Sequence, residues 1–435
     1  MARSTSIYIC QQCGYKSPQY LGKCPQCDSW NSFVETIEES RQLSAVSRQT
    51  LGKAEIVNLS KIQKKDFARV STGLGEFDRV LGGGIVPGSL ILVSGDPGIG
   101  KSTLLTQLSL KVKSALYIAG EESAQQIKIR VDRINSKSDL AVLNETDVDA
   151  IVEAVQREKP GLVIIDSIQT LETTDLNSIA GSVGQVRESA HRLQLIAKAL
   201  HIPIFLVGHV TKEGTVAGPR TLEHVVDVVL SLEGESTSNF RILRSTKNRF
   251  GPTDEVGIFE MEETGMTEVK NPSQVFLDTK VEAPGSAVVA TLTGLRPLLV
   301  EIQALVTKSF LPVPRRTGSG IDNNRLQLLV AVLQKRLGLP LFDKDIFVNV
   351  TGGLKVFEPA ADLAICLAIV SSLKDQTIAR KTVIVGEVGL LGEIRAVQRL
   401  EKRLTEAKKL GFTNVVSPDK VKALARAVKL AFVDN

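Results

Sequence analysis

Short apolar runs alternate with segments of helical periodicity between residues 90 and 208. Buried strands are expected at 90–93, 115–119, 161–166 and 202–208. Helices are expected at 102–110, 123–133 and 185–200. Strands and helices that alternate in this way form a mainly parallel sheet with helices on both faces. The pattern therefore predicts an α/β domain, which we place at residues 69–270.

The pattern changes near residue 271, where Pro272, Pro284 and Gly285 interrupt it. Strand-like and helix-like segments then follow without regular alternation, which indicates an α+β domain at 271–435. Its strands are expected at 287–292, 297–304 and 346–350, its helices at 324–337, 360–373 and 400–410, and a loop at 314–320. Cys366 lies in an apolar run of this domain and is expected in its core.

Composition places the chain among globular proteins. Its 435 residues, 43% of them hydrophobic, can bury a sizeable core divided over two or three domains. The net charge of +5, from 53 basic and 48 acidic residues, permits an anionic partner without identifying one. The sequence starts without an apolar signal core and has no apolar run of about 18 residues, so we expect a soluble, cytoplasmic protein without membrane contact.

Four of the five cysteines form one cluster near the amino terminus. Cys10 and Cys13 are separated by two residues, as are Cys24 and Cys27, and this spacing is typical of four thiolates around Zn²⁺. A redox pair of dithiols and chance spacing are the alternatives. So short a segment cannot build its own core, so we expect zinc to supply the folding energy of a C4 zinc finger at residues 1–34. The aromatic side chains of this finger either stack on bases or pack the small domain.

Residues 35–68 are polar, mixed in charge and without sustained periodicity. This composition is typical of a linker.

A glycine-rich loop follows the strand at 90–93 and fits the pattern G-x-x-x-x-G-K-S. Its main-chain N–H groups are expected to converge on phosphate oxygens, whereas a structural glycine turn is the alternative. Lys101 would reach the β- and γ-phosphates, and the Ser102 hydroxyl would ligate Mg²⁺. The sequence thus predicts a site for ATP and Mg²⁺ that includes Gly95, Asp96, Pro97, Gly98, Ile99, Gly100, Lys101, Ser102 and Thr103.

Carboxylates follow two of the expected strands where a nucleotide site requires them. Asp166 ends the strand at 161–166 and is expected to hold Mg²⁺ through water, although it could instead cap the next helix. Glu121 and Glu122 follow the strand at 115–119, and alternation suggests that only one faces the γ-phosphate. We choose Glu121 to polarise the attacking water, with Glu122 in reserve.

The strand at 202–208 is followed by His209, which could hydrogen-bond the γ-phosphate and signal its loss to the next loop. A lone histidine is also often just a satisfied polar residue. The loop carries Lys212 and Arg220, whose charges suit a DNA phosphate backbone.

Residues 71–265 resemble the RecA-like ATPase core shared with hexameric helicases. The five residues Lys247, Asn248, Arg249, Phe250 and Gly251 match the KNRFG motif of the RadA (Sms) family of bacterial recombination and repair proteins. The zinc finger, the ATPase core and the carboxy-terminal segment also occur in the order of that family. The resemblance implies a ring, expected to be hexameric, that moves on single-stranded DNA and processes recombination intermediates by branch migration in partnership with the RecA recombinase.

The KNRFG motif supplies two cations, Lys247 and Arg249. In a ring they could reach the γ-phosphate of a neighbouring subunit and stabilise charge in the transition state, as an arginine finger does. A solvated basic strand end is the alternative. With the family resemblance we favour the role in trans.

The carboxy-terminal domain resembles the protease domain of Lon. The serine nucleophile of that family would fall at Ala360, and its lysine at Glu401 or, with a shift of one residue, at Lys402. Because alanine is no nucleophile, we expect no peptidase activity and interpret the domain as a scaffold for ring assembly and duplex DNA binding. This domain also carries a set of basic residues, namely Arg315, Arg316, Lys381, Arg395, Arg399 and Arg403. They could contact DNA phosphates or could equally well form a solvated charged face.

Three classes of function are therefore compared. An ATP-driven DNA motor is favoured, an ATP-dependent protease is opposed by Ala360 and Glu401, and an ATP-switched assembly or signalling protein is the main alternative. Stimulation of ATP turnover by DNA would separate the motor from the switch.

Overall fold

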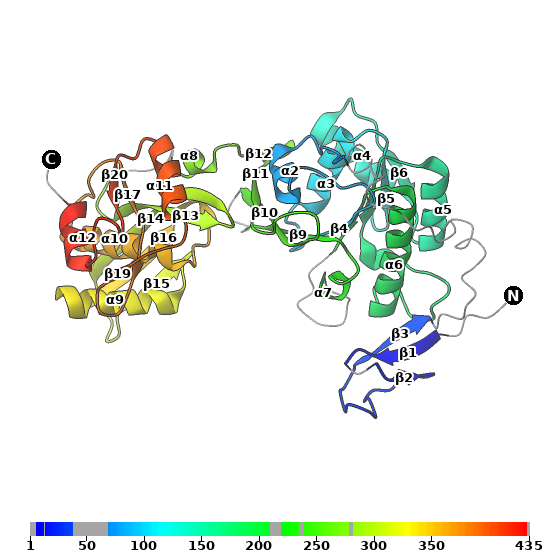
Figure 1. The fold of residues 1–435 in the computed structure, drawn as a ribbon, viewed down its shortest axis with the longest axis horizontal. Coiled ribbons are helices and arrows are strands. Elements are labelled where there is room, and N and C mark those ends of the chain that lie inside the picture. Colours follow the sequence, from blue (N-terminus) through cyan, green and yellow to red (C-terminus); the bar gives the residue numbers. More distant parts are fainter. Residues whose placement is uncertain are drawn as a thin grey trace, which may run out of the picture. The chain divides into compact units, whose positions relative to one another are not determined.

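The computed structural model describes residues 6–12, 14–37, 68–208, 219–234, 239–277 and 282–432. The chain divides into two compact units (Figure 1). The first consists of Met1–Gly234 and Arg241–Glu268, and the second of Glu235–Phe240 and Val269–Asn435. Within the described ranges, no helix is long and apolar enough to cross a membrane.

A nine-stranded sheet forms the centre of the first unit. From one edge to the other its strands are β12 (Gly265–Glu268), β11 (Val256–Glu262), β10 (Phe240–Asn248), β9 (Val228–Glu233), β4 (Leu90–Gly95), β8 (Ile204–Val207), β7 (Leu162–Asp166), β5 (Ala115–Ala119) and β6 (Ala141–Asn144). The strands from β9 to β6 are parallel to one another. The carboxyl ends of β4, β5 and β7 therefore meet at one edge of the sheet.

Alternate side chains of β4 face two separate cores. Ile91 and Val93 pack into one core with α2 (Gly75–Leu81), α3 (Lys101–Lys111) and α4 (Ala124–Asn135). Leu90 and Leu92 pack into the other core with α5 (Val148–Glu158) and α6 (Val183–Leu200). The expected α/β class, a mainly parallel sheet covered by helices on both faces, is confirmed. Two short elements complete the unit, η3 (Ile168–Thr170) and α7 (Pro219–Leu222).

The amino-terminal part of the first unit is a small antiparallel sheet. Its order is β2 (Lys16–Ser17), β1 (Ser6–Cys10) and β3 (Phe33–Ile37). Its core is small, with buried Cys10, Cys24 and Phe33.

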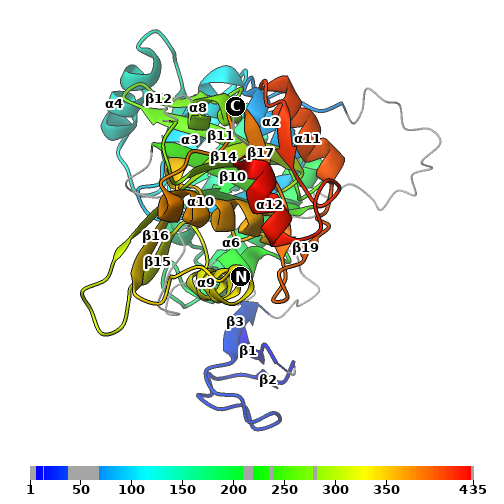
Figure 2. The ribbon, with the colours of Figure 1, turned by 90° about the vertical axis from the view of Figure 1, so that its left-hand side faces the viewer.

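The second unit contains a mixed six-stranded sheet. Its order is β15 (Arg316–Ser319), β16 (Lys344–Val350), β14 (Arg296–Lys308), β13 (Ser286–Thr293), β17 (Thr382–Ile384) and β20 (Asn414–Val416). The helices are α8 (Pro272–Leu277), α9 (Asn323–Leu337), α10 (Asp362–Lys374), α11 (Leu400–Lys409) and α12 (Leu424–Ala431). The apolar α10 packs on β13 and β14, and Cys366 within it is fully buried, as expected. Helix α10 also lies beside α12 (Figure 2).

One segment of the second unit differs from the expectation. Residues 314–320 were expected to form a loop, but Arg316–Ser319 form the edge strand β15, which pairs in parallel with β16. Gly318 and Gly320 mask the strand character of this stretch, since glycine is depleted in strands.

Candidate functional site

The P-loop turns between β4 and α3 through backbone conformations that favour glycine. Gly100 caps α3 with a φ of 109°, and a Cβ at this position would lie 2.2 Å from Cε of Met266. A side chain here would displace the flexible ends of Met266 and Met261 and would strain the backbone. The backbone conformation thus favours glycine at the second glycine position of the pattern.

Lys101 folds back into the loop. Its Nζ donates hydrogen bonds to the carbonyl oxygens of Gly95, at 2.8 Å, and Asp96, at 2.9 Å, and only 4% of its surface is exposed. Burial lowers the pKa of Lys101, while the nearby carboxylates of Asp166, Asp96 and Glu121 act in the opposite direction. A buried ammonium at the start of a helix, where main-chain N–H groups converge, fits a bound polyphosphate.

Two side chains hold the P-loop and its helix against the antiparallel edge of the sheet. Gln107 on α3 accepts a hydrogen bond from the N–H of Met266 at 2.8 Å and donates to its carbonyl oxygen at 3.0 Å. Buried Arg241 on β10 donates from Nε to the carbonyl oxygen of Ile99 at 3.1 Å. Sequence reasoning missed both residues, because only the fold brings partners this far apart in the chain together.

Glu121 and Asp166 lie at adjacent strand ends. Ala119 on β5 pairs with Asp166 on β7, so the residues after β5 lie beside the carboxylate. Ser167 donates its hydroxyl to Oε1 of Glu121 at 2.7 Å. Glu121, Asp166 and Lys101 therefore share one electrostatic environment.

The neighbouring Glu122 is held in another direction. Its carboxylate forms an ion pair with Arg130 on α4, and its carbonyl oxygen accepts a hydrogen bond from Asn144 at 2.7 Å. Of the two adjacent glutamates, the structure places Glu121 next to Ser167 and Glu122 next to Arg130.

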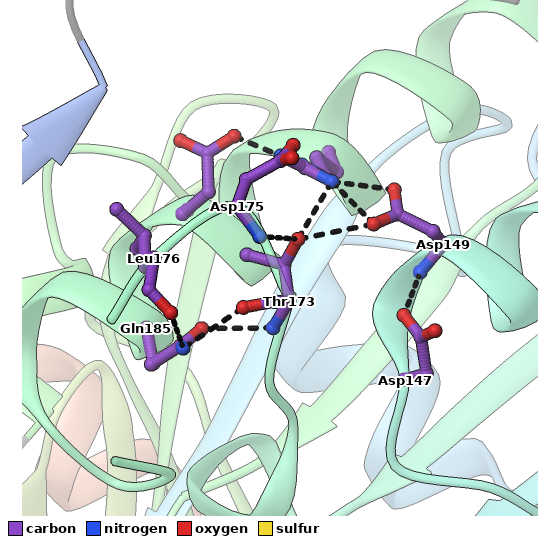
Figure 3. Close-up of polar contacts among 8 residues, drawn as sticks. Asp147, Asp149, Thr173, Asp175, Leu176 and Gln185 are labelled. Carbon is purple, nitrogen blue, oxygen red and sulfur yellow. Dashed lines mark hydrogen bonds and ion pairs between the residues drawn. The ribbon is translucent and has the colours of Figure 1, made fainter. Parts of the chain in front are cut away.

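The segment that follows η3 is fixed by buried hydrogen bonds (Figure 3). Gln185 is 1% exposed, accepts a hydrogen bond from the N–H of Thr173 at 2.9 Å and donates to the carbonyl oxygens of Thr173, Leu176 and Ser178. Arg192 on α6 adds ion pairs with Asp149, Asp175 and Glu188. The chain that leaves the Asp166 end of β7 is thus tied to α5 and α6.

The KNRFG motif lies at the opposite end of the strands from the P-loop. Asn248 pairs with Val228, and Val228 pairs with Ile91 near the start of β4. Gly95, at the other end of β4, pairs with Leu232. Since a strand rises about 3.3 Å per residue, Ile91 and Gly95 are about 13 Å apart along β4.

Contacts within the same chain engage both cations of the motif. Lys247 donates from Nζ to the carbonyl oxygens of Glu223 and, at 2.9 Å, of Val226. Burial and the charge of Arg249 lower the pKa of Lys247. Arg249 forms an ion pair with buried Asp227 at 3.1 Å, and its guanidinium remains half exposed.

The second unit places the remaining basic candidates in different environments. Arg315 is exposed and Arg316 begins β15. Arg403 is 1% exposed and donates to both carboxylate oxygens of Glu358, each at 2.7 Å. For this residue both interpretations, a phosphate contact and a solvated charged face, are therefore wrong. Its position in α11 gave no sign of this buried partner.

The positions compared with the Lon dyad also differ in burial. Ala360 is 3% exposed and belongs to the core of the second unit. Glu401 is exposed, and the neighbouring Lys402 donates from Nζ to the carbonyl oxygen of Leu295 at 2.8 Å.

The cysteine cluster has the geometry of a metal centre. The sulfurs of Cys10, Cys24 and Cys27 all lie within 4.8 Å of one another, and those of Cys10 and Cys27 are 3.6 Å apart. Around a tetrahedral Zn²⁺ with Zn–S bonds of about 2.3 Å, sulfurs are about 3.8 Å apart, so this arrangement fits zinc. The two turns match, since Gly14 N–H donates to Cys10 O and Asp28 N–H to Cys24 O, each at 2.9 Å.

The aromatic side chains beside this cluster are only partly packed. Trp30 is 72% exposed, with Nζ of Lys23 6.0 Å from its ring centroid, and Tyr20 is 52% exposed. Packing of the small domain, one of the two interpretations, therefore does not account for Trp30.

Several candidates lie outside the described residues. These are Cys13, which is the fourth cysteine, and His209 and Lys212, which both follow β8 in the sequence. Arg220 falls within α7, but its side chain is outside the described part of the structure.

Three segments of the chain match known families. Residues 8–35 match the rubredoxin metal binding domain, 57–215 the AAA domain, and 322–421 subunit ChlI of Mg-chelatase. The AAA domain implies a nucleotide with Mg²⁺, and the metal binding domain agrees with the cysteine cluster in indicating zinc. The part of the first unit built on the nine-stranded sheet is thus an ATPase core.

Two solved structures of low similarity overlap part of the chain. The KaiC-like protein PH0186 from Pyrococcus horikoshii OT3 is 20% identical with a TM-score of 0.37, covering 47% of this chain and 99% of that one. The RadB recombinase is 22% identical with a TM-score of 0.38, covering 46% of this chain and 99% of its own.

Much closer relatives cover nearly the whole sequence. DNA repair protein RadA of Bacillus subtilis is 51% identical over 430 residues, which are 96% of this chain and 93% of the relative. DNA repair protein RadA of Streptococcus pyogenes serotype M6 is 50% identical over 423 residues, with the same two coverages. The chain therefore belongs to the RadA family of DNA repair proteins.

Proposed function

We propose that this chain is a DNA-dependent ATPase that assembles into a ring, expected to be hexameric, on single-stranded DNA. It processes recombination intermediates in the cytoplasm by branch migration, in partnership with the RecA recombinase. The observation that carries the proposal is the separation of two cations, Lys247 and Arg249, from the P-loop of the same chain. Such a separation is expected when a nucleotide site is completed by a neighbouring subunit.

The chain's own residues divide the work at the nucleotide. Lys101 and the main-chain N–H groups of the P-loop bind the β- and γ-phosphates. Ser102 and Asp166 hold Mg²⁺, which neutralises phosphate charge when it is bound. Glu121, oriented by the hydroxyl of Ser167, positions the attacking water.

Lys247 and Arg249 act on the site of the neighbouring subunit. Asn248, which lies between them, is about 13 Å of strand from the start of their own P-loop. Both side chains are engaged at that end of the sheet, away from the γ-phosphate position of the same chain. Arg249 is half exposed, so part of its guanidinium is accessible beside Asp227. There it would stabilise the charge that develops in the transition state.

DNA is held by charge along its backbone. Lys212, Arg220, Arg315 and Arg316 are the proposed phosphate contacts, and His209 reports loss of the γ-phosphate to the loop that carries the first two. Four thiolates, from Cys10, Cys13, Cys24 and Cys27, hold a structural zinc without an open coordination position. The Lon-like domain acts as a scaffold.

Steady-state ATP hydrolysis with and without single-stranded DNA tests the motor directly. We expect strong stimulation by DNA in the natural protein, and none in Lys101→Ala, which loses the phosphate-binding ammonium. Stable ATP-dependent assembly without any stimulation would instead favour the ATP-switched assembly or signalling protein.

A mixing experiment tests the role in trans. Lys101→Ala retains an intact KNRFG motif and Lys247→Ala retains an intact P-loop, so each variant alone should hydrolyse little ATP. In mixed rings, a complete site forms wherever the P-loop of a Lys247→Ala chain meets the KNRFG motif of a Lys101→Ala chain. Random assortment of the two variants completes about a quarter of the sites. Activity that stays at the level of the separate variants would contradict a shared site.

A further inference from the structure

Tyr117 connects the hydrophobic core to the carboxylate that ends β7. It lies on β5 opposite Ile164, and its side chain is fully buried. Its hydroxyl donates to Oδ2 of Asp166 at 2.5 Å. Hydrogen bonds to an ionised acceptor are short and about twice as strong as neutral ones, so this contact restricts the carboxylate strongly.

Arg130 sets the direction of that hydrogen bond. Its Nη1 lies 3.5 Å from the hydroxyl oxygen of Tyr117, and its Nη2 binds both carboxylate oxygens of Glu122. A guanidinium only donates, so the tyrosine oxygen accepts from Arg130 and its proton is left for Asp166. A continuous chain of polar contacts therefore runs from Glu122 through Arg130 and Tyr117 to Asp166.

This contact occupies one of the two oxygens of Asp166. The Tyr117 hydroxyl lies on Oδ2, with Arg130 on the other side of the hydroxyl oxygen. The other oxygen, Oδ1, remains to face a cation.

We propose that Tyr117 and Arg130 are positioning residues for the nucleotide site: Tyr117 fixes Asp166 with Oδ1 presented to Mg²⁺, and Arg130 keeps Glu122 apart from Glu121. The inference rests on the proposed role of Asp166 in holding Mg²⁺. It explains why two adjacent glutamates are not equivalent: one is paired with a cation on α4, and the other lies at the strand end beside Ser167. Partners of this kind orient metal ligands in many sites.

Tyr117→Phe removes the hydroxyl and keeps the ring that packs the core. The readout is equilibrium binding of a fluorescent methylanthraniloyl derivative of ATP, titrated with Mg²⁺ or measured in EDTA, so that turnover does not enter. We expect unchanged binding in EDTA and about a tenfold increase in the Mg²⁺ concentration for half-maximal binding. Tyr20→Phe is the matched control, since its hydroxyl contacts Asn31 in the zinc finger.

Asp166→Asn separates failure of the inference from failure of the proposed function. If Asp166→Asn shifts the Mg²⁺ titration but Tyr117→Phe does not, the positioning role is wrong and the metal role of Asp166 stands. If neither variant shifts it, the metal role falls as well. In the double variant we expect no additional shift from Tyr117→Phe, because its partner is already lost; an additive shift would contradict the coupling.

A purely structural role predicts a different result. Tyr117→Phe would then lower the urea midpoint of unfolding and weaken ATP binding equally with Mg²⁺ and with EDTA. Arg130→Met provides a second route if Tyr117→Phe folds poorly, since it breaks the same chain of contacts from the surface side. It is expected to shift the Mg²⁺ titration in the same direction, and an unchanged titration would overturn the role of Arg130.

Discussion

Lys101 is a charged residue that the protein keeps almost fully buried. Its hydrogen bonds to two loop carbonyls offset part of the cost of removing the ammonium from water. Burial lowers the pKa of Lys101, and the surrounding carboxylates only partly oppose this. The ammonium of Lys101 is therefore easier to deprotonate than that of an exposed lysine.

This shift predicts how ATP binding depends on pH. Only the protonated ammonium attracts phosphate, and a lowered pKa means that the proton is lost at a lower pH than from an ordinary lysine. ATP affinity, measured by calorimetry, should therefore fall as the pH rises toward the usual lysine range. Lys101→Arg keeps its charge over this range and is the control, so parallel pH profiles for the two proteins would contradict the expectation.

At this scale the sequence predicts what is local. The spacing from Gly95 to Ser102 specifies a loop between a strand and a helix, and the structure has that order. Gln107, Arg241 and Tyr117 could not be found in the same way, because each acts through a partner from a distant part of the chain. For the same reason the sequence could not show that Arg403 is buried.

Among the elements, the zinc finger depends most on chemistry outside a hydrophobic core. Its buried cluster is small, and two of the three buried members are cysteines. A metal that bridges these sulfurs would supply the folding energy that so small an apolar core cannot.

Removing the metal is therefore expected to unfold the finger and leave the ATPase core intact. Trp30 is the chain's only tryptophan and lies in the finger, so its fluorescence reports on this element alone. A zinc chelator should shift the Trp30 emission, because the turns at the two cysteine pairs are lost. The far-ultraviolet circular dichroism should change little, because the ATPase core stays folded. Without any chelator, Cys24→Ser should give the emission spectrum that the natural protein gives with chelator. A Trp30 emission that neither the chelator nor Cys24→Ser changes would count against a zinc site.

Some of the elements that the sequence pattern missed have no clear apolar period. In β10 the buried positions include Arg241 and Ser245, so burial and hydrophobicity no longer coincide. β6 has no buried residue, and β12 is only four residues long. The parallel centre could be predicted because its strands are continuous apolar runs, which is typical of strands buried on both faces.

The whole molecule consists of two units with separate cores, and each contains an arginine that holds several acceptors. Arg192 ties Asp149, Asp175 and Glu188 together in the first unit, with two of these carboxylates about half exposed. Arg403 in the second unit is buried, pairs with the partly buried Glu358 and also donates to the carbonyl oxygen of Ala290. The two sites allow each unit to be destabilised by itself.

We expect Arg403→Leu to lower the free energy of unfolding of the second unit by about 3–5 kcal/mol, because Glu358 loses its buried partner. Arg192→Ala should cost the first unit only about 1–2 kcal/mol, since its partners are partly solvated. Urea unfolding should show two transitions, each shifted by one variant alone. A single transition shifted by both would mean that the units unfold together.

The placement of the KNRFG motif at the far end of the sheet has a kinetic consequence. If a complete site exists only where two chains meet, the concentration of sites is set by association and not by the amount of protein. Activity per molecule would then fall on dilution, and the apparent order of the reaction in protein would exceed one until assembly is saturated. Below that concentration, chains that are fully folded and have nucleotide bound would be inactive, because each would lack the cations of a neighbouring chain.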